Sequence, residues 1–215
     1  MAFVHVILIL SVFKMAISRD VEYRHMERNT DMCKMFARTP FFESELVMTQ
    51  WRIYYSWNMQ IGPKCVDISF KNATKEIVHR VWSDMNEYLE MQPNWDAAAL
   101  LLNIGSSRRE VMLFTEQGPA GGFTGVPNII RDGNIPPLRK SVSLIKFHMK
   151  LVEGGRYLVV MDCQLGVASL SARSNVAVTL AEITAAAMDL NLGEGHPACS
   201  VARDNEDPFI IKQYI

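Results

Sequence analysis

The four cysteines and five histidines are the residues of this chain whose side chains most readily do chemistry. The cysteines are Cys33, Cys65, Cys163 and Cys199. None belongs to a Cys-x-x-Cys pair and no histidine lies at metal-ligand spacing from any of them, so the sequence predicts no metal site. It also lacks a Gly-x-Ser-x-Gly elbow, a His-Glu-x-x-His motif and a phosphate-binding loop. We therefore assign no catalytic residue and do not expect an enzyme.

The first 18 residues have the pattern of a secretory signal peptide. An apolar run from Phe3 to Phe13 is followed by Ala16-Ile17-Ser18, which has small residues at both positions that a signal peptidase reads. The run is shorter than the ~20 residues that span a bilayer. We expect cleavage after Ser18, a secreted protein and no membrane span. The alternative is a buried N-terminal helix or an uncleaved anchor.

Secretion would change the chemistry of two further features. In an oxidising compartment the four cysteines should form two disulfides, for which three connectivities are possible. Asn72-Ala73-Thr74 is an N-glycosylation sequon, so Asn72 is predicted to carry sugar on a solvent-facing turn. An unused sequon is the alternative.

The composition is that of an ordinary folded domain. The chain has 215 residues, 49% of them hydrophobic, which favours one globular domain over a disordered segment. Its 22 basic and 23 acidic residues give a formal net charge of −1. Such a balance provides neither the basic surface that binds nucleic acid nor a polybasic membrane anchor.

The order of the elements favours an all-β fold. Short β-like runs alternate with turns rich in Gly, Pro and Asn, whereas an α/β fold would need helices between the strands. We predict an N-terminal arm (19–45), an eight-stranded antiparallel barrel (46–174), one amphipathic helix (175–193) and a tail (194–215). The expected strands are Val47–Trp57, Cys65–Phe70, Glu76–Ser83, Ala97–Ile104, Glu110–Thr115, Ser141–Met149, Tyr157–Cys163 and Val167–Arg173.

Several of these strands alternate between apolar and polar residues. From Ser143 to Leu151, for example, every second residue from Ile145 onward is bulky and apolar, which indicates one buried and one wet face. An up-and-down sheet of eight such strands can close on itself and enclose one small ligand. A barrel filled by its own side chains is the alternative.

Three motifs in this order resemble those of the lipocalin family, in particular the insect bilin-binding and insecticyanin-like branch related to apolipoprotein D. Thr49-Gln50-Trp51 matches the family's Gly-x-Trp at the tryptophan. The segment from Val152 to Tyr157 keeps an acid and the final tyrosine of Thr-Asp-Tyr-x-x-Tyr. Arg173 matches the arginine that ends the last strand.

The resemblance implies a fold, a disulfide pattern and a closed barrel base. It implies the up-and-down barrel followed by a helix, with Cys33 bonded to Cys163 and Cys65 bonded to Cys199. Trp51, Tyr157 and Arg173 would form the base, where the Arg173 guanidinium stacks on the Trp51 indole. A lipocalin-like protein needs no cofactor, and its implied partner is a small hydrophobic ligand such as a bilin or a carotenoid.

Two predictions concern the ligand. Inward residues of the upper barrel are expected to line the cavity, and these are Tyr55, Trp57, Phe70, Trp82, Leu113, Phe147 and Met149. Asn103 would add a polar contact if it faces inward. The long segment 116–140, rich in Gly and Pro, is expected to be a lid that contacts the ligand through Phe123, Ile129 and Ile130.

Two functions follow. The first is a secreted carrier that binds a pigment, retinoid, lipid or pheromone-like molecule in the barrel. The alternative is an extracellular interaction protein with a filled barrel, whose segment 116–140 binds a protein partner.

Overall fold

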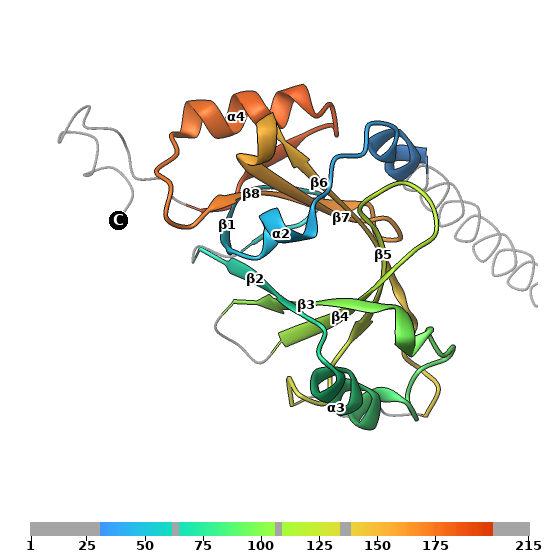
Figure 1. Cartoon of the computed structure of the whole chain (residues 1–215). Coiled ribbons are helices and arrows are strands. Elements are labelled where there is room, and N and C mark those ends of the chain that lie inside the picture. Colours follow the sequence, from blue (N-terminus) through green and yellow to red (C-terminus); the bar gives the residue numbers. More distant parts are fainter. Residues whose placement is uncertain (1–30, 62–64, 106–108, 134–138, 200–215) are drawn as a thin grey trace, which may run out of the picture.

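The chain forms a closed antiparallel barrel of eight strands in up-and-down order, as predicted (Figure 1). The computed structural model describes residues 31–61, 65–105, 109–133 and 139–199. The predicted signal peptide (1–18) and residues 200–215 of the predicted tail lie outside the described residues. The strands are β1 (Gln50–Trp57), β2 (Asp67–Asn72), β3 (Ala98–Ile104), β4 (Arg109–Thr115), β5 (Gly122–Pro127), β6 (Ile145–Val152), β7 (Tyr157–Asp162) and β8 (Val167–Arg173).

Each barrel strand pairs with the next one along the chain, except that β1 closes the sheet by pairing with both β2 and β8. The contact between β1 and β2 is short and joins Gln50–Arg52 to Asp67–Ser69. Beyond it, β1 pairs instead with a ninth strand, β9 (Gly195–Pro197), which the chain reaches after the helix that follows the barrel. The tail therefore completes the edge that β2 leaves uncovered.

The predicted strand Glu76–Ser83 is wrong, because this segment is the helix α3 (Lys75–Met85). The Thr74 side chain accepts a hydrogen bond from the Ile77 backbone N–H and so caps the helix at its start. Val81 and Met85 are buried four residues apart, which is helical spacing. They pack on the outer face of β3 and β4, so α3 lies outside the barrel (Figure 1).

The strand missing from the prediction is β5, which lies within the segment predicted to be a lid. Its glycine content reflects close packing in the wall: a Cβ atom added at Gly125 would lie 2.7 Å from the Phe147 ring. Phe123 points into the barrel, where it contacts the Phe42 ring at 5.3 Å between centroids. Ile129 and Ile130 pack with the cluster under α3. The lid prediction is therefore wrong for the part from Phe123 to Ile130, whereas residues 134–138 of the segment lie outside the described residues.

The helix predicted at 175–193 is present as α4 (Leu180–Asp189). It begins at a capping box, in which Thr179 and Glu182 each bond the other's backbone N–H. Ile183, Ala186 and Ala187 are buried against the outer faces of β7 and β8. The barrel is thus covered by α4 on one side and by α3 on another (Figure 1).

One end of the barrel is closed by packed side chains. The short helix α2 (Ser44–Val47) lies across it, and the Trp51 indole Nε1 donates a hydrogen bond to the Val47 carbonyl at 3.1 Å. The Arg173 guanidinium lies 5.7 Å from the Trp51 ring, the stack that the resemblance implies. Two 3-10 turns, Trp95–Ala97 and Glu153–Gly155, complete the connections at this end.

Both implied disulfides are present and use all four cysteines. Cys33 is bonded to Cys163 with 5.4 Å between their Cα atoms, and Cys65 to Cys199 with 4.8 Å. Cys163 follows β7 and Cys65 precedes β2, so both bonds are made at the end of the barrel opposite α2. They tie residues 31–37, which are helical, and the tail to that open end.

Candidate ligand-binding site

A hollow of about 450 Å³ lies inside the barrel at the end opposite α2. We call this end the mouth. Four connections surround it: β1–β2, β3–β4, β5–β6 and β7–β8. The hollow is lined by Ile53, Met59, Gln60, Ile61, Val66, Ile68, Leu102, Ile104, Arg109, Phe147, Val160, Asp162, Val167 and Ser169. Its size falls within the range of pockets that hold small organic ligands.

The walls of this hollow are mostly aliphatic. Ile53, Ile68, Leu102 and Val160 come from four different strands and face the barrel interior. Each alternates with an outward neighbour, as the pleat of a strand requires. Such a surface binds by removing apolar area from water and sets no strict geometry for its ligand.

Of the seven predicted lining residues, only Phe147 borders the hollow. Phe70, Leu113 and Met149 do face the interior, but they belong to the filled half of the barrel beneath it. Leu113 and Met149 are fully buried there, among the side chains that close the base. These three residues support the floor of the site.

The alternation pattern of β1 predicts the wrong face for Tyr55 and Trp57. The register between β1 and β8 shifts between Ile53 and Tyr55, so Tyr54 is an extra residue in the strand. One extra residue moves all later side chains to the opposite face. Trp57 and Tyr54 consequently pack in the cluster under α4, and Tyr55 packs against it.

Trp82 and Asn103 also lie away from the hollow. Trp82 belongs to α3, is 43% exposed and stacks on His79 with 5.8 Å between ring centroids. Asn103 alternates with Leu102 and Ile104, which line the hollow, and therefore faces outward. Tyr157, a predicted base residue, is buried on the outer face under α4 beside the Arg156 guanidinium. Burial there raises the pKa of Tyr157.

The few polar groups of the hollow lie on β7, β8 and the rim. The Asp162 carboxylate accepts the backbone N–H groups of Gln164 and Leu165 at 2.8 and 2.9 Å, so it holds the β7–β8 turn. Arg109 is paired with Asp132 at 3.3 Å. Ser169 is 4% exposed and lines the wall, and Ser171 lies one step deeper on the same face of β8. The Ser171 hydroxyl is buried without a hydrogen-bond partner among the described residues.

The sequence could have identified part of this lining. Ile53 precedes the bulge and lies two residues after Trp51, so the pattern places both on the interior face. Val160 lies two residues after Leu158 on the interior face of β7. Met59, Gln60 and Ile61 could not be found in this way, because they belong to a connection that crosses the mouth. Their contribution depends on the path of the loop and follows no period.

Three further predictions concern glycosylation, metal binding and membrane insertion. Asn72 is exposed at the end of β2, where its side chain is accessible, and its glycosylation stays a prediction. Within the described ranges, no three His, Cys, Asp or Glu side chains are grouped so that they could hold a metal ion. No helix in the described part of the chain is long and apolar enough to span a membrane.

A scan against protein-family models finds no match for this chain. Searches of curated proteins and of solved structures likewise find no significant similarity. The resemblance to lipocalins thus stays a prediction, while the eight-stranded barrel is observed in the structure.

Proposed function

We propose that this protein is an extracellular carrier that binds one small hydrophobic molecule in the mouth of its barrel. The single observation that supports this function best is the apolar hollow of about 450 Å³ inside a closed eight-stranded barrel. The alternative is a barrel filled by its own side chains. In this protein the packed interior side chains occupy the half of the barrel near α2, which supports a binding site in the other half. The proposed ligand class is that of pigments, retinoids, lipids and pheromone-like molecules.

The binding energy would come from burial. Apolar surface removed from water contributes roughly 25 cal/mol per Å², less the cost of immobilising the ligand. Ser169 and the unpartnered Ser171 hydroxyl would add a hydrogen bond for a ligand with one polar group at its inner end. We therefore favour a mainly apolar molecule with one hydroxyl, carbonyl or carboxyl group.

The two disulfides support the extracellular part of the proposal, since such bonds persist in oxidising compartments. They also leave no free thiol in the chain, which has only these four cysteines. A thiol nucleophile in the cavity is thereby excluded, and we propose binding without catalysis. The alternative interaction surface at 116–140 loses much of its basis, because this segment includes a strand of the barrel wall.

The proposal is tested by filling the hollow. Val160→Phe adds a ring to the half-buried β7 wall, and Val176→Phe makes the same change outside the barrel at a 40% exposed residue. We expect mass spectrometry under non-denaturing conditions to detect a co-purified small molecule in the wild-type protein and in Val176→Phe. Val160→Phe should lose it while keeping the same far-UV circular dichroism. Retention by Val160→Phe, or no bound molecule and no saturable binding of retinol or fatty acid by the wild type, would contradict the carrier function.

A further inference from the structure

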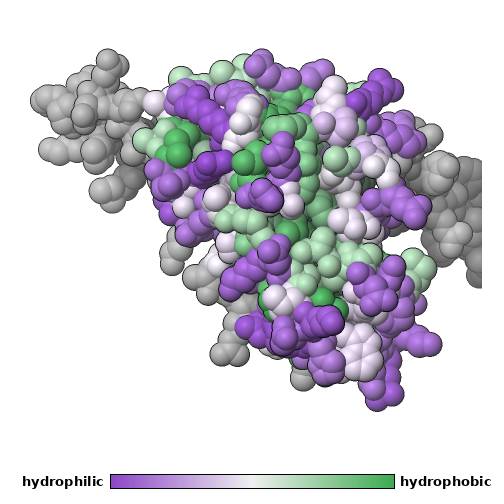
Figure 2. Space-filling model, viewed as in Figure 1, coloured by the Kyte–Doolittle hydropathy of each residue, from purple (hydrophilic) through white to green (hydrophobic). Residues whose placement is uncertain are grey.

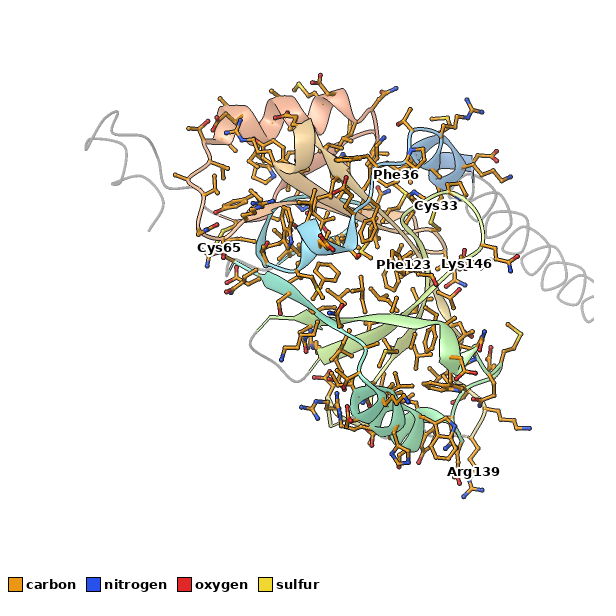
Figure 3. All side chains as sticks on the ribbon, viewed as in Figure 1. Cys33, Phe36, Cys65, Phe123, Arg139 and Lys146 are labelled. Carbon is orange, nitrogen blue, oxygen red and sulfur yellow. A yellow bond between two sulfur atoms is a disulfide. The ribbon has the colours of Figure 1, made fainter. Side chains whose placement is uncertain are left out.

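A second cavity, of about 500 Å³, lies outside the barrel wall. It is bounded by the helical residues 31–37, the turn between β4 and β5, and the outer side of β6. The Cys33–Cys163 disulfide holds the helical segment over this part of the sheet. Figure 3 labels Cys33 on the helical segment and Lys146 below it on the same side of the molecule. We call this space the outer cavity.

The outer cavity is separate from the hollow in the mouth. Its wall contains His148 and Lys146, which alternate with the inward residues Phe147 and Met149 on β6. Among the residues that the structure describes, Phe147 alone borders both spaces. A ligand in one cavity therefore lies across the barrel wall from a ligand in the other.

His148 is an unusual wall residue because it is polar, buried and unsatisfied. The side chain is 5% exposed, and its Nε2 atom has no hydrogen-bond partner among the described residues. The ring packs edge-on against Phe36 with 5.6 Å between centroids. Burial lowers the pKa of His148, the nearby Lys150 lowers it further, and Glu116 acts in the opposite direction. A buried polar atom without a partner is costly, which indicates a group that a ligand could satisfy.

The charges around the outer cavity favour an anion. Lys34, Arg38 and Lys146 line it, against the single carboxylate of Glu116. Glu116 already accepts a hydrogen bond from the Thr124 hydroxyl at 2.5 Å, and Lys34 is paired with Asp31 at 3.3 Å. Among the described residues, Arg38 and Lys146 have no carboxylate partner. Within this part of the chain, these two cations could pair with an anionic ligand.

The apolar part of the lining complements these charges. Ala37, Pro119 and the Phe147 ring lie beside Gly122, whose lack of a side chain widens the space. The cavity consequently combines an apolar wall with one buried imidazole and two cations that have no carboxylate partner among the described residues. That combination suits a molecule with an apolar chain at one end and a negative charge at the other.

We propose that the outer cavity is a second ligand site, which binds an amphiphile carrying one carboxylate. The carboxylate lies at Arg38 and Lys146, the apolar chain lies against Ala37, Pro119 and Phe147, and the buried edge of His148 gains a polar partner. This inference is independent of the proposed carrier function, since it uses a different face of β6.

The experiment follows the histidine ring directly. Wild-type protein with isotope-labelled histidine is titrated with dodecanoate, and the imidazole resonances are followed by NMR across pH. We expect His148 to shift saturably and its pKa to rise on binding, because a nearby carboxylate favours the charged ring. Dodecanol, which has the same chain without the charge, should leave the pKa of His148 unchanged. The resonances of His79 and His196 serve as internal references.

Variants separate this site from the mouth and from a general charge effect. Arg38→Gln with Lys146→Gln should weaken the His148 response about tenfold or more, because charged hydrogen bonds are lost. Lys71→Gln with Lys75→Gln removes two exposed charges elsewhere and should bind dodecanoate at His148 like the wild type. Val160→Phe should also keep the response. An unchanged His148 spectrum with dodecanoate, equal weakening by both charge pairs, or loss of the response in Val160→Phe would overturn the proposal.

Discussion

The two ends of the barrel are held together in different ways. At the end under α2, Val47, Trp51 and Leu158 are fully buried and fill the interior. At the mouth the interior is hollow, and the connections are tied by Cys33–Cys163 and Cys65–Cys199. A space kept open for a ligand lacks the packing that stabilises the other end. The comparison indicates that covalent bonds replace at the mouth what side chains supply at the base.

The molecular surface on the side of α2 carries a band of apolar residues. In Figure 2 the apolar residues gather along the middle of this face, between the polar outer surfaces of α4 and α3. Figure 3 shows the side chains that fill the space beneath this face, among them Phe123.

The largest expected loss of stability comes from removing a disulfide at the mouth. The Cys65–Cys199 bond joins residues 134 apart, so replacing both cysteines with serine should lower the free energy of unfolding by about 4–5 kcal/mol in the chain-entropy model. Urea denaturation of the double variant measures this loss. The wild type in reducing buffer provides a second measurement. A loss below about 1 kcal/mol would show that the mouth is held by packing after all.

The second prediction removes the packing at the other end. Trp51→Ala deletes a fully buried indole together with its hydrogen bond to Val47 and its contact with Arg173. We expect a loss of about 3–5 kcal/mol of unfolding free energy, as for large buried aromatic side chains. Trp82→Ala is the matched control, because this side chain is 43% exposed, and should cost far less. Equal losses in the two variants would contradict a packed base.

The third prediction compares both ends within one strand. Met149 is fully buried in the base, and Phe147 borders the hollow two residues away on the same face of β6. Met149→Ala should destabilise the protein by about 2–5 kcal/mol with little change in ligand affinity. Phe147→Ala should cost about 1–2 kcal/mol and change the affinity for the barrel ligand. Thermal unfolding and ligand titration on both variants test this division, which the reverse order of effects would contradict.

The sequence predicted the barrel and the helix that follows it. How well it predicted which side chains face the interior differs from strand to strand, for a physical reason. Strands such as β6 and β7 alternate over their full length, so their faces could be assigned. In β1 the alternation of bulky residues continues through Trp57, but the bulge at Tyr54 reverses the face. A bulge depends on pairing with β8, which no local pattern contains.

The errors at α3 and β5 have a similar cause, because in both segments the local sequence also fits another structure. Ile77, Val81 and Met85 support a helix by spacing, yet the same segment also has the short apolar runs of a strand. Gly122 and Gly125 are typical of loops, and the close approach of the Phe147 ring explains why β5 has a glycine at position 125. The predicted strand number was right because one false strand replaced one missed strand. The mouth lining from 59 to 61 depends on the path of a loop.

The fourth prediction concerns α4, which lies outside the barrel and belongs to neither end. Thr179→Ala removes the hydroxyl that accepts the Glu182 backbone N–H at 3.2 Å. We expect a loss of about 1 kcal/mol of unfolding free energy, typical of an N-cap, with unchanged ligand affinity. Chemical denaturation measures the loss, and Thr179→Ser is the control that keeps the hydroxyl. A change in affinity would show that α4 is coupled to the mouth.

The smallest expected effect is a pH dependence at the same cap. The backbone N–H of Thr179, the Arg156 guanidinium and the Thr179 hydroxyl lower the pKa of Glu182 to about 2. Because the folded-state pKa lies below the unfolded value near 4.5, this contribution to stability is present above that value. It is lost as the pH falls toward about 2.

The difference in unfolding free energy between the wild type and Glu182→Gln should therefore be constant above about pH 5 and shrink below it. Asp189→Asn, at the other end of α4, controls for the general effect of acid, and a difference that grows with falling pH would contradict the assignment. Because Glu182 contacts neither the base nor the hollow, both ends of the barrel should keep their separate responses across this range.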